Sequence, residues 1–216
     1  GAVLEKYPGK TFFCVECFEP QVTEREEVRT VVIDRKPAFR KAGSLFKDYL
    51  ESVAGDDEAV KGGVLFYTGT EDRKEEYDAF LEGFGDKSLQ GEYLLMRELK
   101  TENNRSEALT FIGDLKTRNV AAVLVAASQL NASCMEQLIR EGIPVITENR
   151  AGTSAYASGV LFSIESSYQI VVQAVIEAIQ EVDNSNIRVS SVLVQGKARE
   201  ANFFKKTSNF AVRTYF

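Results

Sequence analysis

Polar side chains that could bind a small ligand lie at the ends of three apolar segments. Thr68, Thr70 and Asp72 lie at or just after segment 63–68, Ser128, Gln129 and Asn131 follow segment 120–126, and Glu148, Asn149 and Arg150 follow segment 143–147. Hydroxyl, amide, carboxylate and guanidinium groups can hydrogen-bond to sugar hydroxyls or nucleobase edges. If the segments are parallel strands, their carboxyl ends meet at the sheet edge where open α/β sheets bind ligands. We therefore take these residues as candidate ligand-binding residues.

Each of the three groups also has a purely structural interpretation. Thr70 could cap the helix that follows it, with Glu71 and Asp72 placed favourably against the helix dipole. Asn131 could cap the next helix in the same way. The Glu148–Arg150 group could be a solvated turn with a local ion pair. Ligand contact and structural support are compatible for the same residue, so both interpretations stay open at this point.

The sequence contains few of the residue types and motifs that catalysis or metal binding requires. It contains no histidine, which excludes a serine-histidine-acid triad and a histidine-based zinc site. No phosphate-binding loop or glycine fingerprint for dinucleotides is present, which disfavours nucleotide polyphosphates. The adjacent carboxylates Glu71 and Asp72 are explained by helix capping, and nothing fixes two carboxyls across a cleft. We expect no catalytic residues, no metal ligands and no cofactor, and hence a protein that is not an enzyme.

The elements that would position the candidate residues alternate between strands and helices. Short apolar blocks are typical of strands buried on both faces of a parallel sheet, and they predict an α/β fold with a doubly wound sheet. The predicted strands are 12–18, 28–34, 63–68, 93–99, 120–126, 143–147, 160–164, 187–194 and 210–216. The predicted helices are 37–52, 72–84, 106–118, 131–141 and 167–182.

Composition narrows the class of protein further. The 216 residues are 44% hydrophobic and carry a net charge of −6, and the basic residues are scattered, which argues against direct contact with nucleic acid. No apolar run approaches the roughly 18 residues that a membrane span needs. The three cysteines, Cys14, Cys17 and Cys134, are expected as packed, unoxidised thiols. Gly1 is not a natural start, so we expect a processed or recombinant piece whose native compartment its N-terminus does not reveal.

Several motifs together resemble the type I periplasmic solute-binding superfamily. They are segment 5–13 (EKYPGKTFF), segment 28–34 (VRTVVID), Ala42-Gly43, segment 63–66 (GVLF), segment 80–84 (FLEGF) and segment 142–146 (GIPVI). The arrangement is most similar to the basic membrane lipoprotein branch, which binds nucleosides. Lactose-repressor-like effector domains share the fold. The match runs through nearly the whole chain to about residue 194.

The resemblance implies a non-enzymatic, two-lobed clamp that encloses a small polar solute, nucleoside-like or sugar-like, for uptake or sensing. An ABC permease would then be a partner, and the location would be periplasmic or that of a cell-surface lipoprotein. The alternative is the ligand-sensing effector domain of a transcription regulator. Within such a clamp, residues 1–34 would be a remnant of the N-terminal lobe with a hinge crossing, 35–164 the C-terminal lobe, and 165–216 the return helix and terminal strands.

The resemblance also implies that much of the first lobe is absent. The apolar face of helix 167–182 would then need another partner, so we expect either an exposed patch or a homodimer through that face. The chain also departs from the family pattern at binding positions. Phe80 stands where sugar binders carry an arginine, and Asn149 stands where many members carry an aspartate. Glu165 and Ser166 stand where the nucleoside group tends to carry a lysine.

Overall fold

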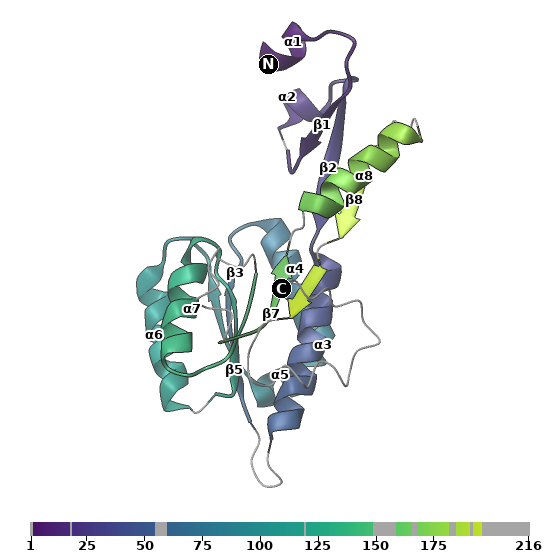
Figure 1. Ribbon diagram of the computed structural model, residues 1–216. Coiled ribbons are helices and arrows are strands. Elements are labelled where there is room, and N and C mark those ends of the chain that lie inside the picture. The colour runs from purple at the N-terminus through teal and green to yellow at the C-terminus, as the bar shows by residue number, and fades with distance from the viewer. Residues whose placement is uncertain are drawn as a thin grey trace. The chain divides into compact units, whose positions relative to one another are not determined.

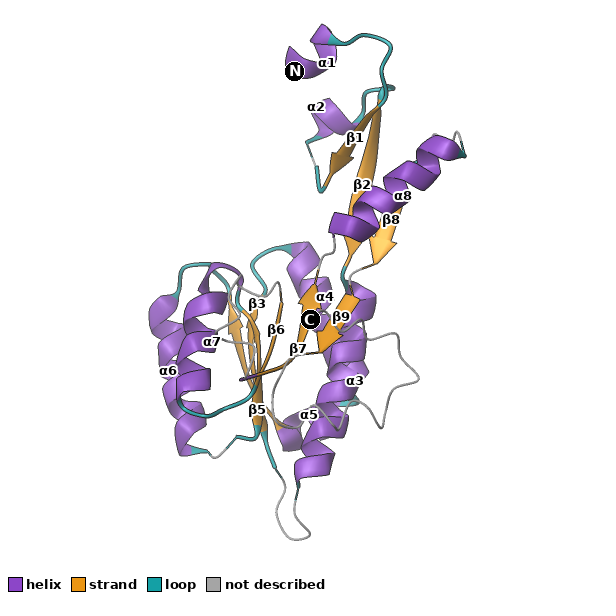
Figure 2. Cartoon of the chain, viewed as in Figure 1, coloured by secondary structure: helices purple, strands orange, loops and turns teal. Residues whose placement is uncertain are grey.

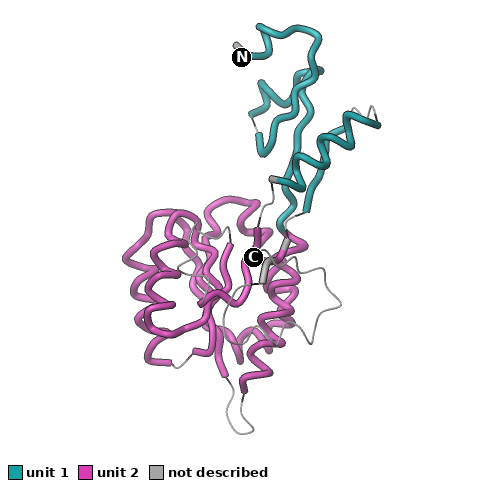
Figure 3. Tube along the Cα trace, viewed as in Figure 1, with its two compact units in different colours: residues 1–35, 166–191 teal, residues 36–165, 192–216 magenta. Residues whose placement is uncertain are grey.

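The computed structural model describes residues 2–17, 19–54, 60–118, 120–148, 159–165, 168–181, 185–190 and 192–195. The chain forms two compact units, shown in different colours in Figure 3. Unit 1 comprises residues 1–35 and 166–191, and unit 2 comprises residues 36–165 and 192–216. The chain therefore passes from one unit to the other three times.

Unit 2 is built on a six-stranded sheet (Figure 1). Its strands are β3 (Gly62–Tyr67), β4 (Leu94–Leu99), β5 (Ala122–Ala126), β6 (Val145–Glu148), β7 (Val160–Glu165) and β9 (Val192–Gln195). They lie in the order β4-β3-β5-β6-β7-β9. All neighbours pair in parallel except β9, which is antiparallel to β7. The predicted doubly wound α/β fold is confirmed.

Helices cover both faces of this sheet, as Figure 2 shows. One face carries α3 (Lys36–Val53), α4 (Glu71–Phe84) and α5 (Lys87–Tyr93), and the other carries α6 (Arg105–Thr117) and α7 (Asn131–Arg140). Alternate residues of β3 serve the two layers. Val64 and Phe66 belong to the core beneath α3 and α4, whereas Leu65 belongs to the core beneath α6 and α7. This alternation explains why β3 reads as a continuous apolar run.

Unit 1 holds a separate three-stranded sheet. Its strands β1 (Phe12–Val15), β2 (Val28–Asp34) and β8 (Ile187–Ser190) lie in the order β1-β2-β8 and are all parallel. Two short helices, α1 (Ala2–Lys6) and α2 (Pro20–Thr23), belong to the same unit. The long helix α8 (Tyr168–Gln180) packs on the sheet through Val171, which contacts the cluster of Val31 and Val189.

Several sequence predictions for single elements need correction. The predicted strand 187–194 is wrong, because the chain forms two strands here, β8 and β9, that belong to different sheets. The strand predicted over 12–18 ends at Val15, since Glu16 adopts a positive φ of 52°. Helix α5 was not predicted, and the predicted strand 210–216 lies outside the described residues. The three cysteines are unbonded, as expected.

Two glycines let α3 and α4 pack backbone to backbone. A Cβ atom placed on Gly43 would collide with the carbonyl oxygen of Phe80, and one placed on Gly83 would collide with that of Arg40. Backbone atoms cannot yield as a flexible side chain does, so only glycine permits this approach. Gly43 and Gly83 are among the residues that carry the family resemblance, and the contact between the two helices explains why glycine is needed there.

We predict that Gly43→Ala or Gly83→Ala lowers the free energy of unfolding by about 1–3 kcal/mol, the usual cost of overpacking a tight contact. Chemical denaturation followed by circular dichroism would measure the change. Gly113→Ala in α6 is the matched control, because a Cβ there has no neighbour within 4 Å. It should stabilise the helix by about 0.5–1 kcal/mol. Equal effects at all three positions would contradict the packing argument.

Helix α8 exposes an apolar stripe on the side that does not face its sheet. Val172, Ile176 and Ile179 are 55%, 42% and 58% exposed. Their spacing of four and three residues places them on one side of the helix. An exposed stripe of this kind accords with the expectation for this helix, and the homodimer itself stays a prediction.

We predict that the stripe on α8 makes the chain either dimerise or bind a hydrophobic dye, and that Ile176→Gln weakens whichever behaviour is found. Size-exclusion chromatography with light scattering and a dye titration would measure the two properties. Gln173→Ala, on a polar position of the same helix, is the control. A monomer with low dye binding would contradict the prediction.

Candidate functional site

The strand order of unit 2 defines where a ligand would bind. From β3 the chain proceeds to β4 on one side, and it later returns to β5 on the other side of β3. The helices that follow β3 and β5 lie on opposite faces of the sheet, and open α/β sheets bind ligands beyond the strand ends at such a point. The region beyond the carboxyl ends of β3 and β5 is here called the crevice. Segments 68–70 and 127–129 border this crevice, and β6 ends beside it with Glu148.

A buried arginine ties these strand ends together. Arg73, in the first turn of α4, donates two hydrogen bonds to Glu148, at 2.6 Å to Oε2 and 2.8 Å to Oε1. It also donates to Glu76 at 2.6 Å and to the carbonyl oxygen of Ala126, the last residue of β5, at 2.9 Å. One side chain thus links the start of α4 to the ends of β5 and β6.

The charge of Arg73 is paired with carboxylates and largely buried from solvent. The side chains of Arg73, Glu76 and Glu148 are 16%, 6% and 6% exposed. The guanidinium lies over the rings of Phe66 and Phe39, with its carbon 4.8 Å and 5.8 Å from their centroids. Burial by itself lowers the pKa of Arg73, but the charges and hydrogen bonds of Glu148 and Glu76 outweigh it, so the pKa is raised above its usual value. Two carboxylates thus bind one guanidinium.

Asn131 and Thr68 support the same edge of the sheet. Asn131 is buried, accepts a hydrogen bond from the Ala127 amide and donates one to Glu148 at 3.2 Å. Both ends of its amide thus have protein partners, and it does not cap α7, whose N-cap is Leu130. Thr68 is also buried and donates to Glu98 at 3.1 Å while accepting from Lys100 at 3.0 Å. The hydrogen bond from Lys100 lowers the pKa of the Glu98 carboxyl below its usual value.

The remaining candidate residues lie at the exposed border of the crevice. Thr70 is the N-cap of α4, as predicted, and its hydroxyl accepts from the Arg73 amide at 3.4 Å. Asp72 is exposed in the first turn of the same helix. On the opposite border, Ser128 and Gln129 both donate to Glu102, at 3.2 Å and 2.9 Å.

The structure therefore groups most of the predicted residues but adds one that sequence reasoning missed. Asn149 and Arg150 lie outside the described residues. Arg73 was not among the candidates, because a charged residue in an amphipathic helix normally faces solvent. The sequence does contain one indication of its role. Arg73 follows Gly69 by four positions, which places it in the first turn of the helix that follows β3.

The described part of the chain contains no group of three or more histidine, cysteine, aspartate or glutamate side chains that could hold a metal ion. Among the same residues, no helix is both long and apolar enough to cross a membrane.

We predict that Arg73→Met lowers the free energy of unfolding by about 3–5 kcal/mol, because it removes the buried guanidinium that Glu148 and Glu76 share. Glu148→Gln should cost less, since Arg73 then keeps Glu76. Urea denaturation of the purified variants would measure both changes. Arg140→Met is the control: this arginine is 75% exposed and pairs with Glu136 on the surface of α7. It should change stability by less than about 1 kcal/mol. A larger loss for Glu148→Gln than for Arg73→Met would refute this account.

No protein-family model and no curated protein sequence matches the chain. Solved structures do resemble it, and three of them serve as examples. One is a solute-binding protein of an ABC transporter system from Aeropyrum pernix K1, with a TM-score of 0.62 and 12% identity over 97% of this chain and 61% of that one. Another is an ABC transporter, LacI-family transcriptional regulator from Brachyspira murdochii, with a TM-score of 0.55 and 16% identity over 77% of this chain and 62% of that one.

The third is a carbohydrate transporter solute-binding protein from Agrobacterium radiobacter, in complex with D-arabinose. Its TM-score is 0.56, with 13% identity over 86% of this chain and 66% of that one. The chain thus spans about three fifths of the length of the first of these structures, which it matches over 61%. At these identities the likeness concerns the fold, and it does not single out the nucleoside-binding branch. The chain shares the fold of these solute-binding proteins and of the regulator, as its sequence motifs suggested.

Proposed function

We propose that unit 2 binds a small polar solute, sugar-like or nucleoside-like, at the carboxyl ends of β3 and β5, without catalysing a reaction on it. The observation that carries this proposal is the polar cluster at the crevice of the sheet. Arg73, Glu148 and Asn131 form a rigid, internally paired floor at the place where sheets of this order bind ligands. A floor of this kind can hold the neighbouring ligand-contacting side chains in a fixed geometry. Less conformational entropy is then lost when the ligand binds.

The contacts with the solute are assigned to the exposed groups at the border. The Thr70 hydroxyl makes only a 3.4 Å hydrogen bond as an acceptor, and Gln129 uses its amide nitrogen toward Glu102. The Gln129 carbonyl oxygen makes no hydrogen bond to the described part of the chain. Asn149, which directly follows β6 in the sequence, is the third contact that we propose.

The chemistry of these groups favours an uncharged, hydroxyl-rich solute. Hydroxyl and amide groups can both donate and accept hydrogen bonds, as sugar hydroxyls do. The Arg73 guanidinium is already bound by two carboxylates, which disfavours an anionic solute such as a sugar phosphate. The D-arabinose bound in one of the solved neighbours supports the sugar class by analogy of fold alone.

A solute-binding protein of this kind would deliver its ligand to an ABC permease from a periplasmic or cell-surface location, and lipoprotein anchoring belongs to the same proposal. The alternative is an effector domain of a LacI-type regulator, which the likeness to the Brachyspira murdochii structure supports. Both roles would use the same binding site, so the site does not distinguish them, but the neighbouring genes and the rest of the protein would. A permease gene beside this one favours transport, whereas a DNA-binding segment on the same chain favours regulation.

We predict that at least one sugar or nucleoside raises the melting temperature of the 216-residue protein in a thermal-shift screen. A ligand at one hundred times its dissociation constant should stabilise the folded state by about 2.7 kcal/mol. Gln129→Ala should weaken binding, because it removes a contact at the crevice.

Gln173→Ala provides a close control for that variant. Gln173 is also exposed, and it donates to Glu177 at 2.8 Å, much as Gln129 donates to Glu102, but it lies on α8 in unit 1. It should leave the ligand-induced shift unchanged. No shift from any sugar or nucleoside, or equal losses in both variants, would reject the proposed site.

A further inference from the structure

Glu102 bridges two of the strand ends at the proposed solute site. It lies in segment 100–104, which joins β4 to α6. Its Oε1 accepts a hydrogen bond from the Ser128 hydroxyl at 3.2 Å, and its Oε2 accepts one from the Gln129 side-chain amide at 2.9 Å. Because β3 lies between β4 and β5 in the sheet, this bridge joins the strand ends on either side of β3.

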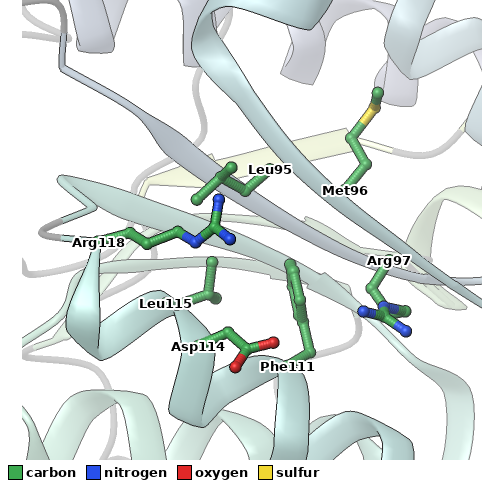
Figure 4. Close-up of a pocket in the computed structure, with 7 residues that line it drawn as sticks. All are labelled: Leu95, Met96, Arg97, Phe111, Asp114, Leu115 and Arg118. Atoms are coloured by element: carbon green, nitrogen blue, oxygen red, sulfur yellow. The ribbon is translucent and has the colours of Figure 1, made fainter.

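The segment that carries Glu102 is held at both ends. In Figure 4 the Phe111 and Leu115 side chains of α6 point toward β4, and Leu95 of β4 packs against the same core. Asn104 is the N-cap of α6, and its side chain fixes the first turn of that helix. The packing of β4 on α6 therefore gives Glu102 a defined place beside the end of β5.

A carboxylate fixes the direction of both hydrogen bonds in this bridge. It can only accept, so the Ser128 hydroxyl proton and the Gln129 amide nitrogen must both point toward Glu102. The groups that remain are the lone pairs of the Ser128 oxygen and the carbonyl oxygen of Gln129. Neither receives a hydrogen bond from the described part of the chain. These two side chains, here called the 128–129 border, therefore present hydrogen-bond acceptors to a solute.

The backbone of Ser128 is a second sign that this border is held in place. Its φ is 53°, and among the described residues Glu16 is the only other non-glycine residue with a positive φ. This conformation is strained for a residue with a Cβ atom, and it persists only where the surrounding contacts hold it. Residues of this kind concentrate at binding and catalytic sites, and the bond to Glu102 is one of the contacts that hold Ser128.

We propose that Glu102 is a positioning residue that sets the specificity of the solute site. It takes the donors of Ser128 and Gln129, so only a solute group that donates a hydrogen bond can bind at the 128–129 border. This inference rests on the function proposed above and narrows its solute class. Thr70, on the other border, has the opposite character, because its hydroxyl proton has no acceptor among the described residues. A sugar hydroxyl can donate at one border and accept at the other, whereas an ether or a carbonyl group can only accept.

Glu102→Gln tests the inference without changing the size of the side chain. A carboxylate offers two acceptors, but an amide offers one acceptor and one donor. Either Ser128 or Gln129 must then reverse its hydrogen bond, and the 128–129 border gains a donor. The variant should therefore tolerate a solute that cannot donate there.

The probes are D-glucose, D-ribose, D-arabinose and adenosine, each with its monodeoxyfluoro analogues, in which fluorine replaces one hydroxyl and cannot donate. Titration calorimetry measures the dissociation constants. In the wild-type protein, the analogue with fluorine at the 128–129 border should bind about tenfold or more weakly than its parent, because the border is left without a donor. In Glu102→Gln this ratio should fall by about threefold or more.

Glu177→Gln is the matched control for this variant. Glu177 also accepts a hydrogen bond from a glutamine amide, that of Gln173 at 2.8 Å, but the pair lies on α8 in unit 1. It should leave every ratio unchanged. A merely structural role of Glu102 would weaken parent and analogue alike, so an unchanged ratio in Glu102→Gln overturns this inference and leaves the proposed function intact. If no parent compound binds the wild-type protein, the proposed function and this inference are both rejected.

Discussion

The buried guanidinium of Arg73 is the constraint around which unit 2 is arranged. A buried charge needs partners of opposite charge and well-placed hydrogen bonds. Without them, the free energy lost by desolvation exceeds the free energy gained from the interactions. Glu148 supplies that match with two parallel hydrogen bonds, and Glu76 and the Ala126 carbonyl accept further ones, while Nε of Arg73 is buried without a hydrogen-bond partner. These partners come from α4, β5 and β6, so the charge can be buried only when all three elements are in place. The crevice geometry follows from this requirement.

Much of the fold could be predicted because strands buried on both faces are continuous apolar segments in the sequence. β3, β5, β6 and β7 are buried along nearly their whole length, and each one coincides with an apolar block of the sequence. The signal fails where the chain changes partners without changing composition. Residues 187–194 (IRVSSVLV) are rich in β-branched residues and contain no glycine or proline, yet β8 pairs with β2 and β9 pairs with β7. Nothing local to the sequence records which sheet a strand will join.

The candidate site could be predicted in part, because the carboxyl ends of strands are known once the strands are known. Thr70 and Glu148 were found in this way. Arg73 was not, since its partner Glu148 lies 75 positions away and no local pattern reveals the pairing. The prediction for Asn131 was incomplete for a similar reason: its two partners, Ala127 and Glu148, become visible only when the strands are side by side. Long-range pairing of polar groups is the information that a single sequence lacks.

The division of unit 1 between two distant stretches of chain has a consequence for biosynthesis. All five parallel strands of unit 2, with the helices between them, lie within residues 36–165, so this sheet can assemble while the ribosome is still translating. The apolar face of β2 at Val31 must wait for Val171 and Val189, which emerge 140 and 158 residues later. During that interval the apolar face of β2 lacks the side chains that cover it in the folded unit, although the parallel strands of unit 2 have already been made.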